Sequence, residues 1–169
     1  VIYINTFTKS LSSTMRISYM VLPPELANRF LEQLSFYSCT VSNFEQYALM
    51  RFINEGYFEK HINRMRNFYH KQRDILLDAI KRSPLSSHVT IMEEDSGLHF
   101  LLKLKMELSD KEFMQRALQK GVKLNSLSAY YHDSPDDFAA HTFIINYSYL
   151  NTEHLAKAIN VLYDCIKNR

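Results

Sequence analysis

A lysine and an arginine lie seven residues apart near the start of the chain, in a segment rich in hydroxyl side chains. Lys9 follows the apolar run 1–4, and Arg16 comes seven positions later. A lysine amine whose pKa is lowered by desolvation or by neighbouring cations attacks a carbonyl and forms a Schiff base. A guanidinium grips a phosphate through two parallel hydrogen bonds, with Thr6 or Thr8 as further donors. Together these residues suit an aldehyde cofactor that carries a phosphate, which is pyridoxal phosphate.

The spacing of these residues also fits a simpler interpretation. Lysine beside threonine and serine is common in solvated turns, and a surface arginine needs no ligand. The choice between a cofactor site and a solvated turn therefore depends on the sequence beyond this segment.

Four segments of the chain, in order, resemble one family. Residues 4–26 resemble the cofactor-lysine segment of fold type I aminotransferases, and most of all that of the MocR subgroup of GntR-family transcription regulators. Residues 58–74 fit the same subgroup. The motifs Gly-Leu-His-Phe at 97–100 and Gly-Val at 121–122 follow in the expected order. The resemblance extends over nearly the whole chain.

The resemblance implies a role for each residue of the first segment. Lys9 would be the Schiff-base lysine, and Arg16 would bind the cofactor phosphate with help from Thr6 and Thr8. In the family, further contacts to the cofactor come from residues upstream of this lysine and from the partner subunit. We therefore expect pyridoxal 5'-phosphate to bind the full-length protein and not this segment alone.

Several positions depart from the family pattern. Family members usually have proline and glycine in place of Ser13 and Thr14, and glycine in place of Ser18 and Asn146. The family arginine that clamps the α-carboxylate of the substrate aligns with Ile144, which has no side-chain donor. Because the charged anchor is missing, we expect an aminotransferase-like domain with little or no transaminase activity.

Composition limits the classes of function. The chain has 169 residues, of which 46% are hydrophobic and 22% charged, which indicates a globular protein of one domain or a domain with part of another. A net charge of +2 is too small to indicate nucleic-acid binding by this segment. Cys39 and Cys165 lack metal-ligand spacing, as do the histidines, so we predict no metal and a reduced, cytoplasmic setting. No apolar run is long enough to span a membrane.

Hydrophobic periodicity and turn signals predict the elements. The first half should contain strands at 1–5 and 17–22 and helices at 24–34, 42–55 and 57–81. The second half should contain strands at 89–92, 98–104, 122–124 and 142–149 and helices at 109–120 and 151–166. Basic residues on the helix at 57–81 are mixed with aromatics that need burial, which favours a solvated face over a nucleic-acid surface.

These elements predict an α/β fold type I aminotransferase-like fragment. Residues 1–40 would be the incomplete C-terminal edge of the large cofactor-binding domain, and residues 41–82 connecting helices. Residues 83–169 would form a small C-terminal α+β domain, with an antiparallel or mixed sheet covered by helices on one face. Two strands cannot make a sheet with its own core, so we expect a segment of a longer polypeptide.

Three functions remain open. The first is the ligand-sensing, dimerising domain of a MocR-type regulator, which would contact DNA only through an upstream domain and respond to an amino-acid or vitamin B6-type effector. The second is an aminotransferase acting on amino acids such as 2-aminoadipate or aromatic amino acids. The third, for the isolated segment, is a structural domain without cofactor. We favour the regulator, as a homodimer without membrane contact.

Overall fold

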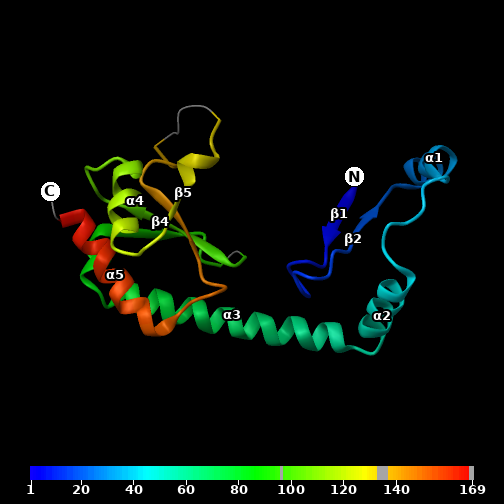
Figure 1. Cartoon of the computed structure of the whole chain (residues 1–169), viewed down its shortest axis with the longest axis horizontal. Helices are drawn as coiled ribbons and strands as arrows, with labels where there is room; N and C mark the ends of the chain where they lie inside the picture. Colours follow the sequence, from blue (N-terminus) through cyan, green and yellow to red (C-terminus); the bar gives the residue numbers. More distant parts are fainter. Residues whose placement is uncertain (96, 133–136, 168–169) are drawn as a thin grey trace. The chain divides into compact units, whose positions relative to one another are not determined.

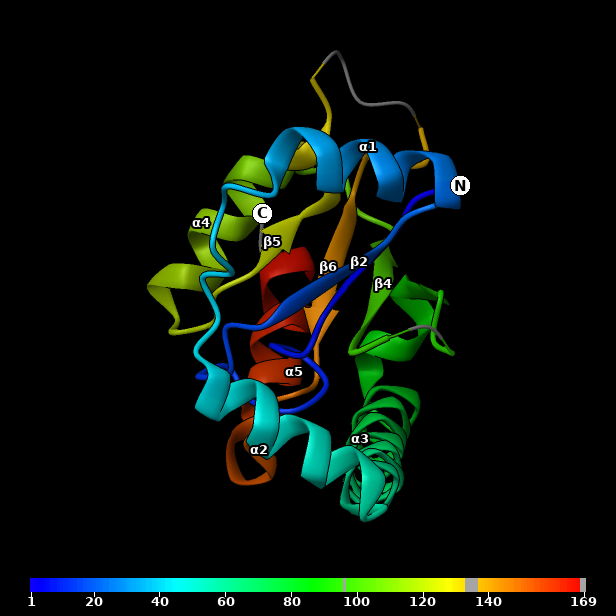
Figure 2. The ribbon, with the colours of Figure 1, turned by 90° about the vertical axis from the view of Figure 1, so that its right-hand side faces the viewer.

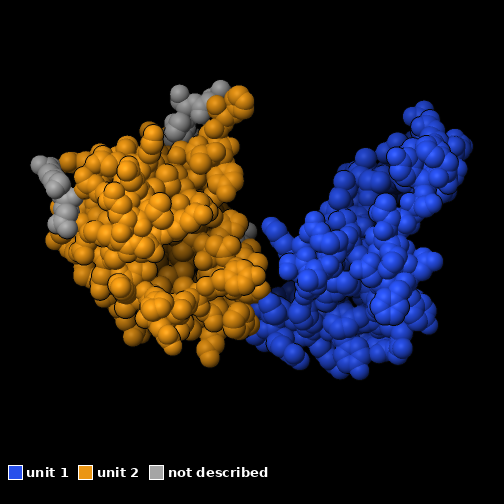
Figure 3. All heavy atoms as spheres, viewed as in Figure 1, with its two compact units in different colours: residues 1–67 blue, residues 68–169 orange. Residues whose placement is uncertain are grey.

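The computed structural model describes residues 1–95, 97–132 and 137–167 (Figure 1). The chain forms two compact units, Val1–Asn67 and Phe68–Arg169, which are coloured separately in Figure 3.

Unit 1 contains a β-hairpin and helices. Its elements are β1 (Tyr3–Thr6), β2 (Ser18–Val21), α1 (Pro24–Leu34), α2 (Asn43–Asn54) and the first part of α3 (Tyr57–Lys81). β1 and β2 are antiparallel, with Tyr3 opposite Val21 and Thr6 opposite Ser18. The strands and helices predicted for the first half of the chain are therefore confirmed, with ends that shift by one or two residues.

Local signals explain where the helices of unit 1 begin and end. Pro24 occupies the first turn of α1, where a missing backbone N–H costs nothing. At α2, the Ser42 hydroxyl accepts from the Glu45 N–H at 3.2 Å and donates to the Glu45 carboxylate at 3.0 Å. Gly56, with φ of 76°, separates α2 from α3, because that backbone conformation suits a residue without Cβ.

Unit 2 contains a four-stranded antiparallel sheet in the order β3-β4-β6-β5 (Figure 2). The strands are β3 (Val89–Met92), β4 (His99–Leu104), β5 (Asn125–Ser126) and β6 (Thr142–Asn146). The helices are the end of α3, α4 (Asp110–Gln119) and α5 (Thr152–Lys167), with short 3-10 turns η1 (Pro84–His88) and η2 (Leu127–Tyr130). This is the α+β arrangement that the sequence predicted.

The core of unit 2 lies between one face of the sheet and the helices. Phe100, Leu102 and Leu104 alternate along β4 and point to this side, as Phe143 does from β6. The rings of Phe113 on α4 and Phe143 lie 5.2 Å apart. α3 and α5 complete the cluster with Leu76, Leu77, Ile80, Leu155, Ile159, Leu162 and Cys165. Helices thus cover one face of the sheet, as expected for a small α+β domain.

One predicted strand was placed wrongly, and another is shorter than predicted. Residues 122–124 are not a strand, since the Val122 N–H donates to the Ala117 carbonyl at 2.8 Å and closes the end of α4. The strand comes just after, at Asn125–Ser126. β6 ends at Asn146 instead of residue 149, because the Asn146 side chain accepts from the Ser148 N–H at 2.8 Å and starts a turn. No helix among the described residues is long and apolar enough to cross a membrane.

Candidate functional site

The predicted site lies on the loop of the β1–β2 hairpin in unit 1. The Phe7 N–H donates to the Ile17 carbonyl at 2.9 Å and closes the base of this loop. A second bond, from the Leu11 N–H to the Phe7 carbonyl at 2.8 Å, forms the turn that carries Lys9. Arg16 lies in the same loop, two residues before β2 begins at Ser18. The fold therefore places the predicted lysine and arginine on one short, hydrogen-bonded segment.

The side chains of Thr6 and Thr8 form hydrogen bonds within this loop. The Thr6 hydroxyl donates to the Ile17 carbonyl at 3.2 Å, and the Thr8 hydroxyl donates to the Met15 carbonyl at 3.1 Å. The two hydroxyl oxygens lie 3.0 Å apart. Their protons are thus used within the loop, so phosphate binding by either threonine requires its hydroxyl to rotate.

Lys9 and Arg16 are exposed, and in the part of the chain that the structure describes neither side chain has a hydrogen bond or an ion pair. They are also the only charged side chains in residues 1–24, because the first acidic residue is Glu25. An amine and a guanidinium without competing carboxylates fit an aldehyde that carries a phosphate. The donor set of the loop therefore fits pyridoxal phosphate.

An aromatic side chain anchors the loop to the rest of unit 1. The Phe7 ring lies 5.4 Å from the Tyr19 ring and 5.8 Å from the Phe58 ring. Phe7, Tyr19 and the buried Ile17 also line an apolar cavity of about 430 Å³ next to α2. Sequence reasoning did not single out Phe7, although one aromatic residue within a hydroxyl-rich turn is a signal that the turn packs on an apolar surface.

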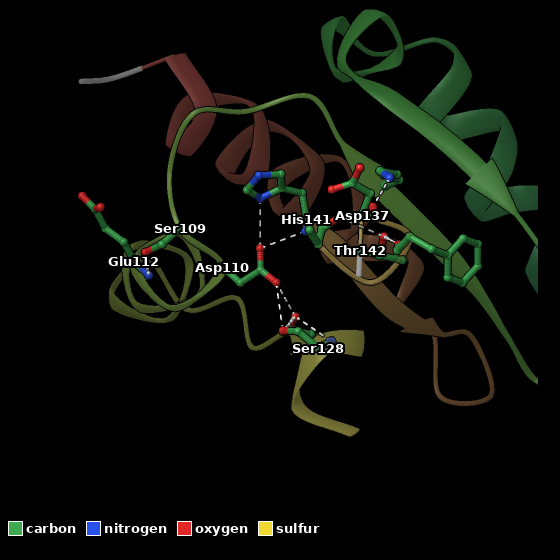
Figure 4. A network of polar contacts seen from close by, with 11 residues as sticks. Ser109, Asp110, Glu112, Ser128, Asp137, His141 and Thr142 are labelled. Carbon is green, nitrogen blue, oxygen red and sulfur yellow. Dashed lines mark hydrogen bonds and ion pairs between the residues drawn. The ribbon is translucent and has the colours of Figure 1, made fainter. Parts of the chain in front are cut away.

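Unit 2 contains a polar cluster centred on Asp110, which sequence reasoning also missed (Figure 4). Its carboxylate accepts from the hydroxyls of Ser126 and Ser128 at 2.6 and 3.0 Å. It also accepts from the His141 N–H at 3.1 Å and lies 3.0 Å from His141 Nδ1. Ser126 is fully buried. The cluster joins the start of α4 to β5 and to the segment before β6, which is a structural role.

Replacement of Asp110 by alanine is expected to destabilise unit 2 by about 1–3 kcal/mol, because buried or partly buried donors would lose their charged acceptor. Thermal unfolding of the variant should show a lower midpoint than the unchanged protein. Asp164→Ala, at an exposed position of α5, is the matched control and should leave the midpoint nearly unchanged. A midpoint for Asp110→Ala equal to that of the control would contradict a stabilising role.

Arg73, from the segment 58–74, and Tyr147 both bond to the turn that leads into the Gly-Leu-His-Phe motif at 97–100. The Arg73 guanidinium donates to the Asp95 carboxylate at 2.8 Å and to the Glu94 carbonyl at 3.3 Å. The Tyr147 hydroxyl donates to the Gly97 carbonyl at 2.7 Å, and burial raises the pKa of that hydroxyl. These bonds tie Glu94, Asp95 and Gly97, which lie between β3 and β4, to α3 and to the residue after β6.

No group of three or more metal-binding side chains comes together among the described residues. Burial raises the pKa of the Cys165 thiol, which lies in the core of unit 2, whereas Cys39 is an exposed free thiol in unit 1.

The sequence and the fold were both compared with those of known proteins. No family model matches the chain. The chain is 44% identical over 135 residues, 80% of its length, to the HTH-type transcriptional regulator YdeL of Bacillus subtilis. It is 33% identical over 162 residues, 96% of its length, to the probable rhizopine catabolism regulatory protein MocR of Rhizobium meliloti. It covers 29% and 32% of these two relatives, about a third of their length.

The solved structures agree with the sequence relatives. A kynurenine aminotransferase from Pyrococcus horikoshii, crystallised with PMP, superposes with a TM-score of 0.78 at 29% identity, covering 99% of this chain and 40% of that one. The chain is a fold type I aminotransferase-like segment of the MocR type. More distant sequence relatives of this MocR-type segment are aminotransferases, at 22–26% identity. Dependence on pyridoxal phosphate is a property of the aminotransferases that share the fold.

Proposed function

We propose that this chain belongs to the ligand-sensing and dimerising domain of a transcription regulator of the MocR and GntR type. The observation that carries the proposal is the pairing of an aminotransferase fold with a 44% identical HTH-type regulator. Because the chain covers about a third of such relatives, DNA contact would belong to another part of the full-length protein. The effector would be an amino acid or a vitamin B6-type compound.

In this proposal the loop of the β1–β2 hairpin holds pyridoxal phosphate in the full-length protein. The Lys9 amine would hold the cofactor through its aldehyde, and the Arg16 guanidinium would bind its phosphate. Thr6 and Thr8 would add hydrogen bonds to the phosphate once their hydroxyls rotate away from the loop carbonyls. When bound, the cofactor supplies an electron-withdrawing ring and an aldehyde that reacts with amines.

The proposal also concerns the organisation of the full-length protein. Residues 1–40 would complete a large cofactor-binding domain, and residues 83–169 would form the small domain. Residues 41–82 would connect these two domains. The protein would act in the cytoplasm as a homodimer, away from the membrane. Many large apolar side chains of unit 1 are exposed, which is consistent with a surface that packs against further protein; they include Ile4, Tyr19, Val21, Phe30, Leu31 and Phe36.

The alternative is an aminotransferase that acts on amino acids such as 2-aminoadipate or aromatic amino acids. The distant aminotransferase relatives favour it. Ile144 opposes it, since this half-buried side chain lies on β6 opposite Leu101 and offers no donor to a carboxylate.

The regulator proposal is tested with the full-length protein and DNA from upstream of its own gene. Fluorescence anisotropy should show binding to this DNA, and the affinity should change when pyridoxal phosphate and individual amino acids are added. A protein that binds no DNA, but forms 2-oxo acids from amino acids, would be the enzyme instead.

We predict that the full-length protein, loaded with pyridoxal phosphate, forms little or no 2-oxo acid from α-amino acids. The physical reason is the missing guanidinium at Ile144, since one charged hydrogen-bond pair stabilises binding by a few kcal/mol. The measurement is 2-oxo acid formation from glutamate, alanine and aromatic amino acids. Ile144→Arg is the matched variant and should raise turnover. Rapid turnover by the unchanged protein would show that another residue supplies the clamp.

A further inference from the structure

Phe7 connects the turn that carries Lys9 to the rest of unit 1. The Phe7 N–H donates to the Ile17 carbonyl at 2.9 Å, and the Phe7 carbonyl accepts from the Leu11 N–H at 2.8 Å. Lys9 lies at the centre of the turn that the second of these bonds closes. The position of the Lys9 backbone therefore depends on the position of Phe7.

The Phe7 side chain packs where the buried residues of unit 1 lie. In unit 1, all of whose residues the structure describes, only Ile17 and Leu49 are buried. Both line the same apolar cavity as Phe7 does. The Phe7 ring also lies 5.4 Å from the Tyr19 ring and 5.8 Å from the Phe58 ring, which it meets edge to face. Residues of β2, α2 and α3 thus surround one half-buried aromatic side chain.

This packing acts together with the hydrogen bonds of the loop. The hydroxyls of Thr6 and Thr8 donate to carbonyls across the loop at 3.2 and 3.1 Å, while Lys9 itself is exposed. Water competes for the hydrogen bonds of a surface loop, so each of them stabilises it modestly in net terms. Water does not compete for the contacts of an apolar ring, and these contacts resist local opening. The Phe7 ring therefore limits opening of the turn around Lys9.

We propose that Phe7 is a positioning residue for the Lys9 amine. The inference rests on the proposed cofactor role of Lys9 and names a residue on which that role depends. When the amine condenses with an aldehyde, a C–N double bond replaces the C–O double bond, and the oxygen leaves as water with both hydrogens of the amine. The nitrogen must first lie about 3–3.5 Å from the carbonyl carbon, in the right orientation. A turn that opens freely holds the nitrogen there for less of the time.

Binding of the cofactor phosphate depends less on the Phe7 ring. Arg16 lies between Met15 and Ile17, and backbone carbonyls on both sides of it are held by hydrogen bonds. The Met15 carbonyl accepts from the Thr8 hydroxyl, and the Ile17 carbonyl accepts from the Phe7 backbone N–H, which a side-chain substitution keeps. Loss of the ring should therefore weaken the bond to the aldehyde more than binding of the phosphate. This difference separates a positioning role from a general role in folding.

The test compares pyridoxal phosphate with 4'-deoxypyridoxine phosphate, an analogue in which a methyl group replaces the aldehyde. Each compound is titrated into the full-length protein by calorimetry. Phe7→Ala should weaken binding of pyridoxal phosphate by at least about tenfold, because misplacement of a reacting group has effects of this size or larger. It should weaken binding of the analogue by less than about threefold. Phe7→Tyr keeps the ring and should retain most of the affinity for both. Phe44→Ala, at a side chain of α2 that is 83% exposed, is the matched control and should change neither affinity.

A variant of Phe58 tests the same contact from α3 and leaves the loop sequence unchanged. Phe58→Ala should weaken binding of pyridoxal phosphate with the same selectivity over the analogue. Phe7→Ala should then add less loss to this variant than it causes in the unchanged protein, because the two rings act through one contact. Phe58→Ala decides the result by itself if Phe7→Ala does not fold.

The inference is overturned if the folded variants bind pyridoxal phosphate as tightly as the unchanged protein does. Equal losses for pyridoxal phosphate and the analogue would also overturn it, because they would indicate a role in folding alone. Failure of the proposed function gives a different pattern. The unchanged protein would then bind both compounds with the same affinity and retain no cofactor on Lys9, and this inference would fail with it.

Discussion

Replacement of Lys9 by alanine in the full-length protein is expected to abolish retention of pyridoxal phosphate. Lys9 is exposed on a loop whose backbone is held by its own hydrogen bonds, so the substitution removes an amine without disturbing a core. A covalent bond between the cofactor aldehyde and this amine would be lost, and only the weaker phosphate contacts of Arg16 would remain. The bound fraction should fall from near stoichiometric to less than about a tenth.

The measurement is the visible absorption band of the lysine-bound cofactor after gel filtration. Lys9→Arg is a second useful variant, because it keeps the positive charge but has no nucleophilic amine. Lys123→Ala removes an exposed lysine of unit 2 and should leave the band intact. A band that persists in Lys9→Ala would assign the covalent role to a different lysine.

A large loss of stability is expected when a side chain in the core of unit 2 is truncated. Phe143 on β6 is fully buried, and its ring lies 5.2 Å from that of Phe113 on α4. Phe143→Ala removes buried apolar area and leaves a cavity, because a close-packed interior collapses only in part. The expected loss of stability is about 3–5 kcal/mol, a large share of what a domain of this size has.

Hydrogen exchange of peptides from β4 and α5 would report this loss directly. Protection of their amides should fall by roughly a hundredfold or more, because each 1.4 kcal/mol changes an opening constant tenfold. Tyr149→Ala, at a side chain that is 96% exposed, is the matched control and should change protection little. Equal protection in Phe143→Ala and in the control would contradict the packing of this sheet against its helices.

The sequence by itself determined most of the helices and the loop that carries the candidate site. Ser42 and Ser109 cap α2 and α4 as their patterns predicted, since a cap depends on residues within one turn. Lys9 and Arg16 lie on one hairpin loop because only six residues separate them between two strands. The chemistry assigned to them is still a prediction.

Only the tertiary structure decided features that depend on residues far apart in the chain. Asp110 finds its partners 16 to 31 residues away, and Arg73 finds Asp95 at a separation of 22. β5 is two residues long and exists through its pairing with β6, so its own periodicity could not locate it. The pairing of His99 with Asn146 likewise follows from strand register, which closure of the whole sheet sets. Capping and turn signals are local and can be read from neighbouring residues, whereas register and polar clusters arise only when distant segments pack together.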